Sequence, residues 1–479
     1  MAKHYNLMVP GCSSAQEKIE VTAPFDDHLI ATFDAADKDT IEQALATAHA
    51  LYLDRQNYLP LPDRLEILRK TAELMREQAE ELALIAAEEG GKPLIDSRAE
   101  VARAIDGVEI CVETMRTSSG EVIPMGVNPA SKNKTAFTTM EPIGVVVAVS
   151  AFNHPLNLIV HQVAPAVATG CPVIVKPAKK TPISCYKFVS LLREAGLPEQ
   201  WCQALVTKDS ALATKLAVDE RVSFLSFIGS EKVGWMLRSQ LAPGTRCALE
   251  HGGVAPVIVA EDADLDAAWP KIIKAGFYHA GQVCVSVQRI YVHESIVDDF
   301  AKTLCNEARK LIVGDPTKER TEVGPLIDPA EVSRLSEWIK EAVDGGAELL
   351  CGGKPLSESC FECTVLLNPQ ESAKVSTSEV FGPLICIYPY SDLSEAIDRA
   401  NSLPYSFQAA VFTKNIDTAM QVYIAINASA VMVNEHTAFR VDWMPFAGLK
   451  RSGYGVGGIP HTIKDMQAEK MLVIHSEAL

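Results

Sequence analysis

Cys284, in the segment HAGQVCVSVQR, is the side chain of this sequence best suited to nucleophilic chemistry. A thiolate adds readily to a carbonyl carbon, the adduct can lose a hydride, and the remaining thioester can be cleaved by water. The small residues and the glycine before the cysteine allow the backbone to approach a ligand closely. The chain has twelve cysteines, so a buried structural thiol is the alternative, and this segment alone favours it.

Two further residues have types and positions that suit the same chemistry. Glu250, in CALEHGGVAP, ends a short apolar stretch before two glycines, and a carboxylate there can deprotonate a thiol or activate water. Asn153, in VSAFNHPLN, directly follows a run predicted to be a buried strand, and ligands collect at the carboxyl ends of such strands. Its amide can stabilise an oxyanion together with the backbone N–H of Cys284. A salt-bridged glutamate and a turn-forming asparagine are the alternatives.

Two segments indicate a phosphate-bearing coenzyme. Lys176 follows the strand PVIV in KPAKKTP, where a lysine can bond ribose hydroxyls or a phosphate; a surface lysine is the alternative. FIGSEKVG, residues 227–234, reads as a strand that runs into a small-residue turn and a helix, whose first N–H groups can hold a pyrophosphate. The motif G-x-G-x-x-G is absent from the chain, so this phosphate signal is weak on its own.

The elements that must position these residues follow from the hydrophobic pattern. Amphipathic helices and one partly alternating strand are predicted early in the chain, the helices at 38–54, 62–89 and 97–117 and the strand at 134–142. From residue 143 onward, near-continuous apolar runs such as GVVVAVS alternate with helices, which is typical of strands buried on both faces of a parallel sheet. The alternation resumes after residue 254 over a length sufficient for a second sheet, so the predicted fold class is α/β of the doubly wound type. The C-terminal strand KMLVIH is expected to pair with 134–142 or with another subunit.

Composition narrows the class of protein. The 479 residues exceed one hydrophobic core, and 48% hydrophobic with 22% charged residues is a globular composition. A net charge of −17 argues against nucleic acid or an acidic membrane surface as a partner. Neither a membrane-length apolar run nor a signal peptide is recognised, so we expect a cytoplasmic protein with reduced thiols. Cys360 and Cys363 form one C-x-x-C pair without a second pair or a histidine cluster, so no metal site is predicted.

These segments, in this order, resemble the motifs of the aldehyde dehydrogenase superfamily, and the resemblance runs over nearly the whole chain. VVAVSAFNHPLN is similar to the P-W-N-F-P segment of that family, VIVKPAKKTP to its coenzyme-ribose segment, and FIGSEKVG to its F-T-G-S segment. LEHGG is similar to E-L-G-G, GQVC carries the cysteine, EVFGP matches as it stands, and PFAGLKRSGYG is similar to P-F-G-G-x-K-x-S-G. Seven such segments in order outweigh the structural alternatives for Cys284, Glu250 and Asn153.

The resemblance implies roles for individual residues. Cys284 would be the nucleophile, Glu250 the general base and Asn153 the oxyanion donor. NAD or NADP would be the coenzyme, and the residues implied to bind it are Phe152, Lys176, Lys179, Gly229, Ser230, Val233, Glu379 and Phe381. Lys179 stands where the family usually has an acidic residue, and a lysine does not repel a 2′-phosphate, so NADP is expected to be tolerated. VTKDS replaces the Gly-rich turn often found before the F-T-G-S segment.

The resemblance also implies a division of the chain into three parts. A Rossmann-like coenzyme domain would comprise 1–118 and 143–252, an α/β catalytic domain 253–454, and a small β oligomerisation arm 119–142 and 455–479. The arm would join the subunits of a homodimer or homotetramer.

Three residues are expected to select the aldehyde. Arg103, His154 and Arg440 resemble the anion-binding positions of superfamily members that act on aldehydes with a phosphate, phosphonate or sulfonate tail. Two arginine forks with a histidine suit a tetrahedral oxyanion group better than a planar carboxylate or an alkyl chain. A salt bridge on the helix surface is the alternative for Arg103, and a structural role is the alternative for Arg440. Phosphonoacetaldehyde is the leading expectation; sulfonated aldehydes, glyceraldehyde 3-phosphate, succinate semialdehyde and lactaldehyde are the alternatives. Some relatives also carry an arginine just before the cysteine, and here that residue is Val283.

Two rival functions remain beside this one. In a CoA-acylating dehydrogenase, CoA rather than water resolves the thioester, but such relatives typically lack the base at the Glu250 position. A catalytically silent structural protein of the same fold would be indicated by loss of the nucleophile, and Cys284 is intact.

Overall fold

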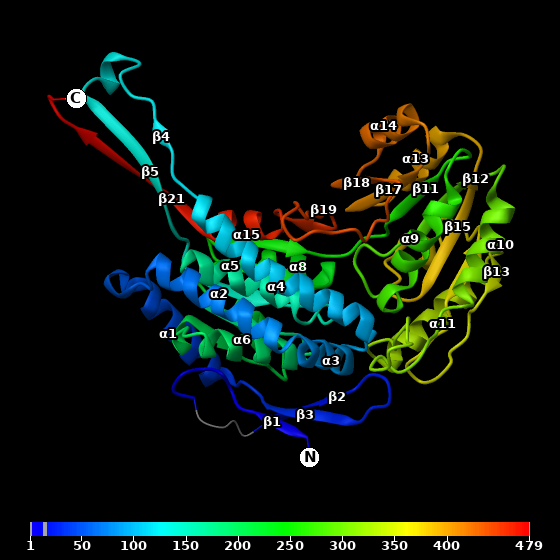
Figure 1. Ribbon diagram of the computed structural model, residues 1–479, viewed down its shortest axis with the longest axis horizontal. Coiled ribbons are helices and arrows are strands. Elements are labelled where there is room, and N and C mark those ends of the chain that lie inside the picture. Colours follow the sequence, from blue (N-terminus) through cyan, green and yellow to red (C-terminus); the bar gives the residue numbers. More distant parts are fainter. Residues whose placement is uncertain (1, 13–16, 479) are drawn as a thin grey trace.

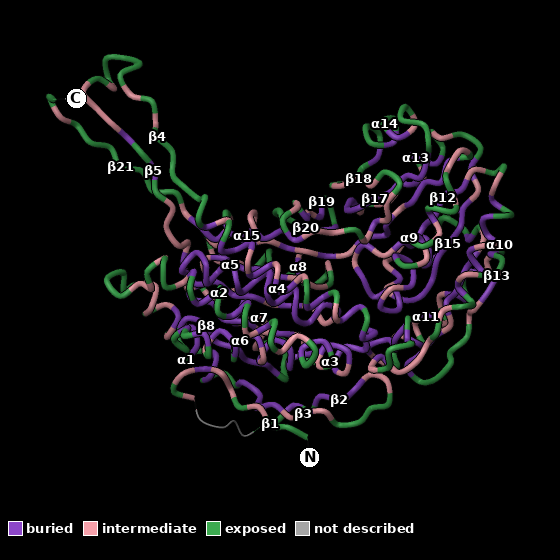
Figure 2. The backbone as a smooth tube through the Cα atoms, in the orientation of Figure 1, coloured by how far each residue is buried: buried purple, intermediate pink, exposed green. Residues whose placement is uncertain are grey.

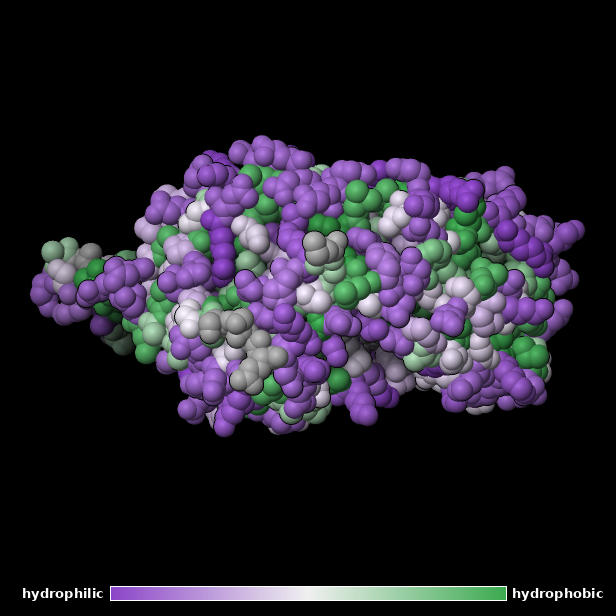
Figure 3. Space-filling model, turned by 90° about the horizontal axis from the view of Figure 1, so that it is seen from below, coloured by the Kyte–Doolittle hydropathy of each residue, from purple (hydrophilic) through white to green (hydrophobic). Residues whose placement is uncertain are grey.

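Two parallel sheets with helices around them, and a projecting arm, make up the computed structural model, which describes residues 2–12 and 17–478 (Figure 1). The doubly wound α/β class predicted from the sequence is confirmed. Within the described residues, every helix is too short or too polar to pass through a lipid bilayer. Hydrophilic side chains are interspersed with hydrophobic ones on the face seen from below (Figure 3).

The first sheet has the order β20-β10-β9-β6-β7-β8, and all its pairs are parallel except that of the edge strand β20. Its central strand β6 reads VVVAV and is buried along almost its whole length, because helices cover both faces of the sheet. The strand bounds are β20 Gly453–Tyr454, β10 Arg246–Glu250, β9 Val222–Ile228, β6 Val145–Val149, β7 Val173–Lys176 and β8 Cys202–Ala204. The strand order reverses between β6 and β9, and ligands bind at such switch points in open α/β sheets.

Helices of the first half of the chain flank this sheet (Figure 1). The predicted helix at 62–89 is two helices, because Gln78 leaves the helical region at φ −106° and ψ 17°. The helix bounds are α1 Lys38–Leu53, α2 Leu61–Glu77, α3 Ala79–Gly90, α4 Leu94–Thr117, α5 Asn157–Thr169, α6 Ile183–Glu194, α7 Ser210–Ala217 and α8 Glu231–Arg238. A small N-terminal sheet, for which the sequence analysis made no prediction, comprises β1 Lys3–Tyr5, β3 Leu29–Asp34 and β2 Lys18–Thr22.

The second sheet has the order β13-β14-β15-β12-β11-β17-β18 and is parallel apart from β13. Its strands are β13 Glu348–Cys351, β14 Thr364–Leu367, β15 Leu384–Tyr390, β12 Arg289–His293, β11 Pro256–Val259, β17 Gln408–Phe412 and β18 Ala430–Val433. Its helices are α9 Leu265–Phe277, α10 Val297–Ala308, α11 Pro329–Asp344, α12 Lys374–Thr377, α13 Leu393–Asn401 and α14 Ile416–Ala425. The short strands β16 Tyr405–Ser406 and β19 Leu449–Lys450 pair with each other.

The arm is a three-stranded antiparallel sheet of β4 Val122–Ile123, β5 Lys134–Pro142 and β21 Gln467–His475. Of the two partners expected for the C-terminal strand, the structure contains the one in the same chain, since β21 pairs with β5 over its full length. Most of β21 is exposed (Figure 2). The segment before β21 was expected to belong to the catalytic domain and the arm, but it packs on the coenzyme domain. Its strand β20 joins the first sheet, and α15 Ile459–Asp465 packs on α4 and α5. We therefore propose the division with residues 453–466 moved to the coenzyme domain.

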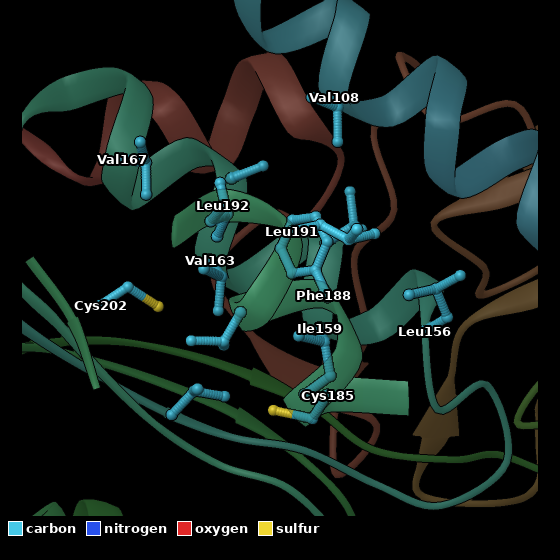
Figure 4. Close-up of a cluster of buried hydrophobic side chains, with 14 of the residues drawn as sticks. Val108, Leu156, Ile159, Val163, Val167, Cys185, Phe188, Leu191, Leu192 and Cys202 are labelled. Atoms are coloured by element: carbon cyan, nitrogen blue, oxygen red, sulfur yellow. The ribbon is translucent and has the colours of Figure 1, made fainter. Parts of the chain in front are cut away.

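The core of the first domain fixes the helix that follows Asn153. Apolar side chains of α5 face those of α6 in a cluster that excludes water (Figure 4); the labelled residues from these two helices and the residue before α5 are Leu156, Ile159, Val163, Val167, Cys185, Phe188, Leu191 and Leu192. A buried leucine or phenylalanine side chain contributes roughly 1.5–3 kcal/mol, so this contact holds α5 rigidly behind the site.

Candidate active site

A cavity of about 850 Å³ contains the switch point of the first sheet and the loop that carries Cys284. It brings together all the residues predicted for the site except Lys176 and Lys179; those lining it are Phe152, Asn153, His154, Gly229, Ser230, Val233, Glu250, Cys284, Glu379, Phe381, Arg103 and Arg440. Residues of the first sheet, of α4, and of the helices and loops around the second sheet line this one cavity, so the tertiary fold joins segments that are far apart in the sequence.

A tight left-handed turn presents Cys284 to the cavity. His279, Ala280 and Gly281 have φ values of 50°, 55° and 70°. Only the third is a glycine, and each of the other two costs of order 1–3 kcal/mol that the surrounding structure must offset. The side chain of Gln282, fully buried, offsets part of this: its Nε2 donates to the Pro325 carbonyl (3.1 Å), and its Oε1 accepts from the Ile327 N–H (2.9 Å).

The Cys284 thiol is protonated at neutral pH in this environment. Burial raises its pKa to about 12, and the carboxylates of Glu379 and Glu250 add to the effect. Arg440 and the cysteine's own backbone N–H act in the opposite direction. A thiol of this kind needs a base before it can attack a carbonyl carbon.

Asn153 lies at the carboxyl end of β6, and its amide is oriented toward the cysteine loop. Its Nδ2 donates to the carbonyl of Gln282 at 2.9 Å, which uses one of the two amide protons and leaves the second for a ligand oxygen. The loop that carries Asn153 is held by α4, where Oε1 of the buried Glu100 accepts hydrogen bonds from the N–H groups of Leu156 and Asn157, each at 3.0 Å. Lys92, also fully buried, pairs with Glu100 at 2.5 Å.

Glu250 is the last residue of β10 and lines the same cavity. Burial raises the pKa of its carboxyl, and Arg440 opposes the shift. A carboxyl with a raised pKa is a stronger base than one in water, so it can accept a proton from the thiol or from a water molecule. Gly457 makes room for it: a Cβ there would lie 2.2 Å from Oε1 of Glu250.

The coenzyme side of the cavity has groups that fit a dinucleotide. Oε1 of Glu379 is buried and has no hydrogen-bond partner among the described residues, as expected of an acceptor that meets a ribose hydroxyl. Burial raises the pKa of this carboxyl to about 8. Phe152 and Phe381 form an edge-to-face pair at 5.8 Å, and Phe381 adopts a left-handed φ of 48°. Ser230 begins α8 without capping it with its own side chain, so the helix N-terminus can receive an anion.

Lys176 and Lys179 lie beside the cavity rather than in its lining. Lys176 is half-buried, and its ammonium donates to the Pro177 carbonyl at 3.1 Å. Burial lowers the pKa of Lys176 to about 8. Lys179 is exposed, while Ala178 between them does line the cavity. Both lysines remain proposed coenzyme ligands, reached by the part of the coenzyme that extends beyond the cavity.

Of the two arginines predicted to bind an anionic tail, one is already paired with a carboxylate. Arg103 donates from Nε and Nη2 to both oxygens of Asp442, at 3.0 and 2.6 Å, so its fork is occupied by a carboxylate. Arg440 has no such partner: its guanidinium stacks on the Phe446 ring at 3.5 Å, and its Nε is buried without a hydrogen bond among the described residues. His154 accepts from or donates to the Tyr278 hydroxyl at 2.8 Å.

Burial and neighbouring cations act together on His154. Burial lowers the pKa of His154 well below its ordinary value, and the next largest contributions to that shift come from Lys92 and Arg103. His154 is therefore a neutral hydrogen-bonding group, and the positive charge comes from the arginines and lysine around it.

Three residues that the sequence analysis did not single out complete the substrate side. Tyr278 lines the cavity and bonds to His154. Asp442 holds Arg103 and also accepts from Nε2 of His161 at 2.7 Å. Burial raises the pKa of the Asp442 carboxyl, but the hydrogen bond and charge of His161, together with the charge and hydrogen bonds of Arg103, outweigh burial and hold this pKa well below its usual range. An aspartate two residues after Arg440, in an apolar segment, was the available signal for such a counter-ion.

Comparisons with known proteins show which family and fold the chain resembles. The family model described as "Aldehyde dehydrogenase family" matches residues 12–472. The chain is 38% identical over 474 residues to a 3-sulfolactaldehyde dehydrogenase of Priestia aryabhattai, covering 99% of this chain and 98% of that protein. Among solved structures, aldehyde dehydrogenase 21 of Physcomitrella patens, in complex with the reaction product succinate, has a TM-score of 0.95 at 33% identity, with 99% of each chain covered. Glyceraldehyde-3-phosphate dehydrogenase GapN of Methanocaldococcus jannaschii, complexed with NADP, has a TM-score of 0.91 at 35% identity, covering 96% of this chain and 99% of that one.

Proposed function

The chain belongs to the aldehyde dehydrogenase family and is an NAD(P)-dependent oxidoreductase, and we propose that its substrate is a short aldehyde with a tetrahedral anionic tail. Phosphonoacetaldehyde is the leading candidate from the sequence. The aldehyde in the name of the Priestia aryabhattai relative, 3-sulfolactaldehyde, carries the same kind of tail. The product is the corresponding carboxylate.

The residues of the cavity carry the proposed reaction in three steps. Glu250 takes the proton of the Cys284 thiol, and the sulfur forms a bond to the aldehyde carbon while the carbonyl π electrons move to oxygen. The second amide proton of Asn153 and the backbone N–H of Cys284 stabilise that oxyanion. When bound, the oxidised nicotinamide supplies the hydride acceptor, and loss of the hydride leaves a thioester on Cys284. Glu250 releases the first proton to solvent and, again a carboxylate, takes a proton from a water molecule whose oxygen bonds to the thioester carbon. The C–S bond breaks, the sulfur leaves as a thiolate that takes the proton back from Glu250, and the acid is released and ionises to the carboxylate.

Arg440 is the observation that supports an anionic tail. Its side chain lines the same cavity as Cys284 and Glu250, and its buried Nε has no partner among the described residues. Nη2 of the guanidinium contacts only a neutral group, Nδ1 of His161 at 3.4 Å, and no carboxylate of the described residues pairs with Arg440. A buried N–H without an acceptor is costly, and a phosphonate or sulfonate oxygen would satisfy Nε and the positive charge. Arg103, by contrast, is already neutralised by Asp442, which uses its Nε and one N–H of Nη2. The tail is therefore proposed to bind mainly to Arg440, with Tyr278 and His154 as neutral hydrogen-bonding groups.

A substrate screen with matched aldehydes tests the proposal. Reduction of NAD and of NADP is followed with phosphonoacetaldehyde, 3-sulfolactaldehyde, glyceraldehyde 3-phosphate, succinate semialdehyde, lactaldehyde and propanal. We expect kcat/KM to be highest for a phosphonate or sulfonate, and Arg440→Ala to raise KM for it by about 30-fold or more while sparing propanal. Equal losses on charged and neutral aldehydes, or a preference for lactaldehyde in the native enzyme, contradict an anion site.

The nucleophile is tested with a matched pair of cysteine variants. Cys284→Ala should abolish dehydrogenase turnover and leave coenzyme binding intact. Cys12→Ala, at another half-buried free cysteine that does not line the cavity, should retain full turnover. Oxidation by Cys284→Ala at a native rate is incompatible with the mechanism above.

We also propose a homodimer or homotetramer working in the cytoplasm. Four consecutive apolar residues of β21, Met471 to Ile474, are 42–57% exposed on the projecting arm, and contact with another subunit would cover them. Removing residues 468–479 should shift the molar mass measured by light scattering toward that of a monomer; an unchanged mass would exclude the arm as the contact.

A further inference from the structure

His251 lies directly after Glu250, beneath the first turn of α8. Its Nδ1 is 2.9 Å from the carbonyl oxygen of Gly229, so the imidazole carries its proton on Nδ1 and donates it to that carbonyl. The side chain is in the interior, at 2% exposure for the residue, and burial lowers its pKa below the ordinary value. The ring is therefore neutral and acts through its hydrogen bond and its shape.

The N–H and the carbonyl of Gly229 are both hydrogen-bonded, to Glu250 at the end of β10 and to His251 directly after it. The Gly229 N–H donates to the carbonyl of Glu250 at 3.0 Å, and the Gly229 carbonyl accepts from His251. The turn that begins α8 is thus attached to the strand that carries the general base.

Packing leaves the imidazole no alternative position. A Cβ on Gly234 would lie 2.0 Å from Cε1 of His251, so the ring occupies the space that a side chain in α8 would need. Phe227 and Trp235 contact the ring edge-on, with centroid distances of 5.8 and 5.7 Å. The ring packs against Gly234 and so supports the first turn of α8. The N–H groups at the start of this helix have no intrahelical acceptor and are open to a ligand.

We propose that His251 is a positioning residue for the coenzyme: it holds the Gly229–Ser230 turn in the conformation that receives the coenzyme diphosphate, and so sets coenzyme affinity. The inference rests on the proposed placement of the diphosphate at Ser230. Where the resembling family motif E-L-G-G has a leucine, which packs but makes no hydrogen bond, this chain has a histidine that does both.

Coenzyme affinity, measured by titration of the free enzyme, is the direct test. Isothermal calorimetry gives Kd for NAD and NADP without turnover. His251→Leu should raise Kd about tenfold, because it removes a buried hydrogen bond, and leave kcat at saturating coenzyme within about twofold. His251→Asn, whose amide N–H₂ can take the place of Nδ1, should restore Kd to within about threefold of the native value. Native affinity in His251→Leu, or equal weakening in both variants, overturns the proposal.

A double-mutant cycle separates support by the ring from general disruption of α8. Gly234→Ala should weaken coenzyme binding in the native background, because its methyl displaces the ring, and should have less effect in His251→Ala, where the ring is gone. Additive effects would refute the inference. Ser230→Glu tests the proposed site separately: it should abolish binding by charge repulsion. If it does and His251→Leu binds normally, only the role of His251 fails; if Ser230→Glu binds normally, the diphosphate placement itself fails.

Discussion

The ionisation of Cys284 is the property of the site most open to a quantitative test. Burial and two carboxylates raise the pKa of its thiol to about 12 from an ordinary value of 9.0. Replacing Glu250 with glutamine removes one of the negative charges and should lower the thiol pKa. Replacing Arg440 with glutamine removes the positive charge that opposes the shift and should raise it further.

The magnitude follows from the shift. A rise from 9.0 to about 12 is worth about 4 kcal/mol of differential stabilisation of the thiol over the thiolate. At pH 8 and below, Cys284 is then ionised about a thousandfold less than a thiol with the ordinary value. The thiolate fraction should rise tenfold for each pH unit up to about 12.

Alkylation kinetics report this fraction directly. The coenzyme-free enzyme is treated with iodoacetamide between pH 7 and 10, and labelling at each cysteine is followed by mass spectrometry of its peptides, with Cys12 as the internal comparison. We expect the rate constant at Cys284 to increase tenfold per pH unit without a plateau, with faster labelling in Glu250→Gln. A plateau below pH 9, or the same rate constants in both Glu250 and Arg440 variants, would refute the reasoning.

Three further outcomes are expected. Gly281→Ala should lower the free energy of unfolding by about 1–3 kcal/mol and reduce kcat, because its φ is +70° and a Cβ would lie 2.1 Å from the Gly382 carbonyl oxygen; Gly126→Ala, with φ +77° and open space, should cost less and leave kcat unchanged. Lys92→Met should lower the free energy of unfolding in urea by about 3–5 kcal/mol, because it leaves the Glu100 carboxylate buried without its cation; a loss under 1 kcal/mol would contradict that pairing. Glu379→Gln should weaken NAD binding in the free enzyme and remove any dependence of Kd on a group that titrates near pH 8, the pKa to which burial raises this carboxyl; a pH profile that persists in the variant would assign it to another group.

The hydrophobic pattern was sufficient to predict most helices and strands, because the formation of each depends mainly on residues close together in the sequence. The buried runs VVVAV and VIVK became β6 and β7 of a parallel sheet, as continuous apolar strands do when helices cover both faces. The predicted helix at 62–89 was wrong as one element, since Gln78 breaks it into α2 and α3, and amphipathic periodicity continues across such a break.

The order of motifs was sufficient to predict that Cys284, Glu250 and Asn153 share one site, and all three line the cavity. The occupied fork of Arg103 could not be predicted in the same way. Its partner Asp442 lies 339 positions away in the chain, and no local pattern records which carboxylate reaches which guanidinium.

Sequence alone determined which residues stand at strand ends and which turns are small enough for a ligand, because backbone propensity and side-chain burial act over a few neighbouring residues. Tertiary structure decided which charges remain free. Nε of Arg440 has no partner within the part of the chain that the structure describes, while Arg103 is neutralised by Asp442, and Glu100 on α4 holds the loop of Asn153. These differences arise from the packing of distant helices and loops around one cavity, where burial makes each unpaired charge costly and each pairing specific.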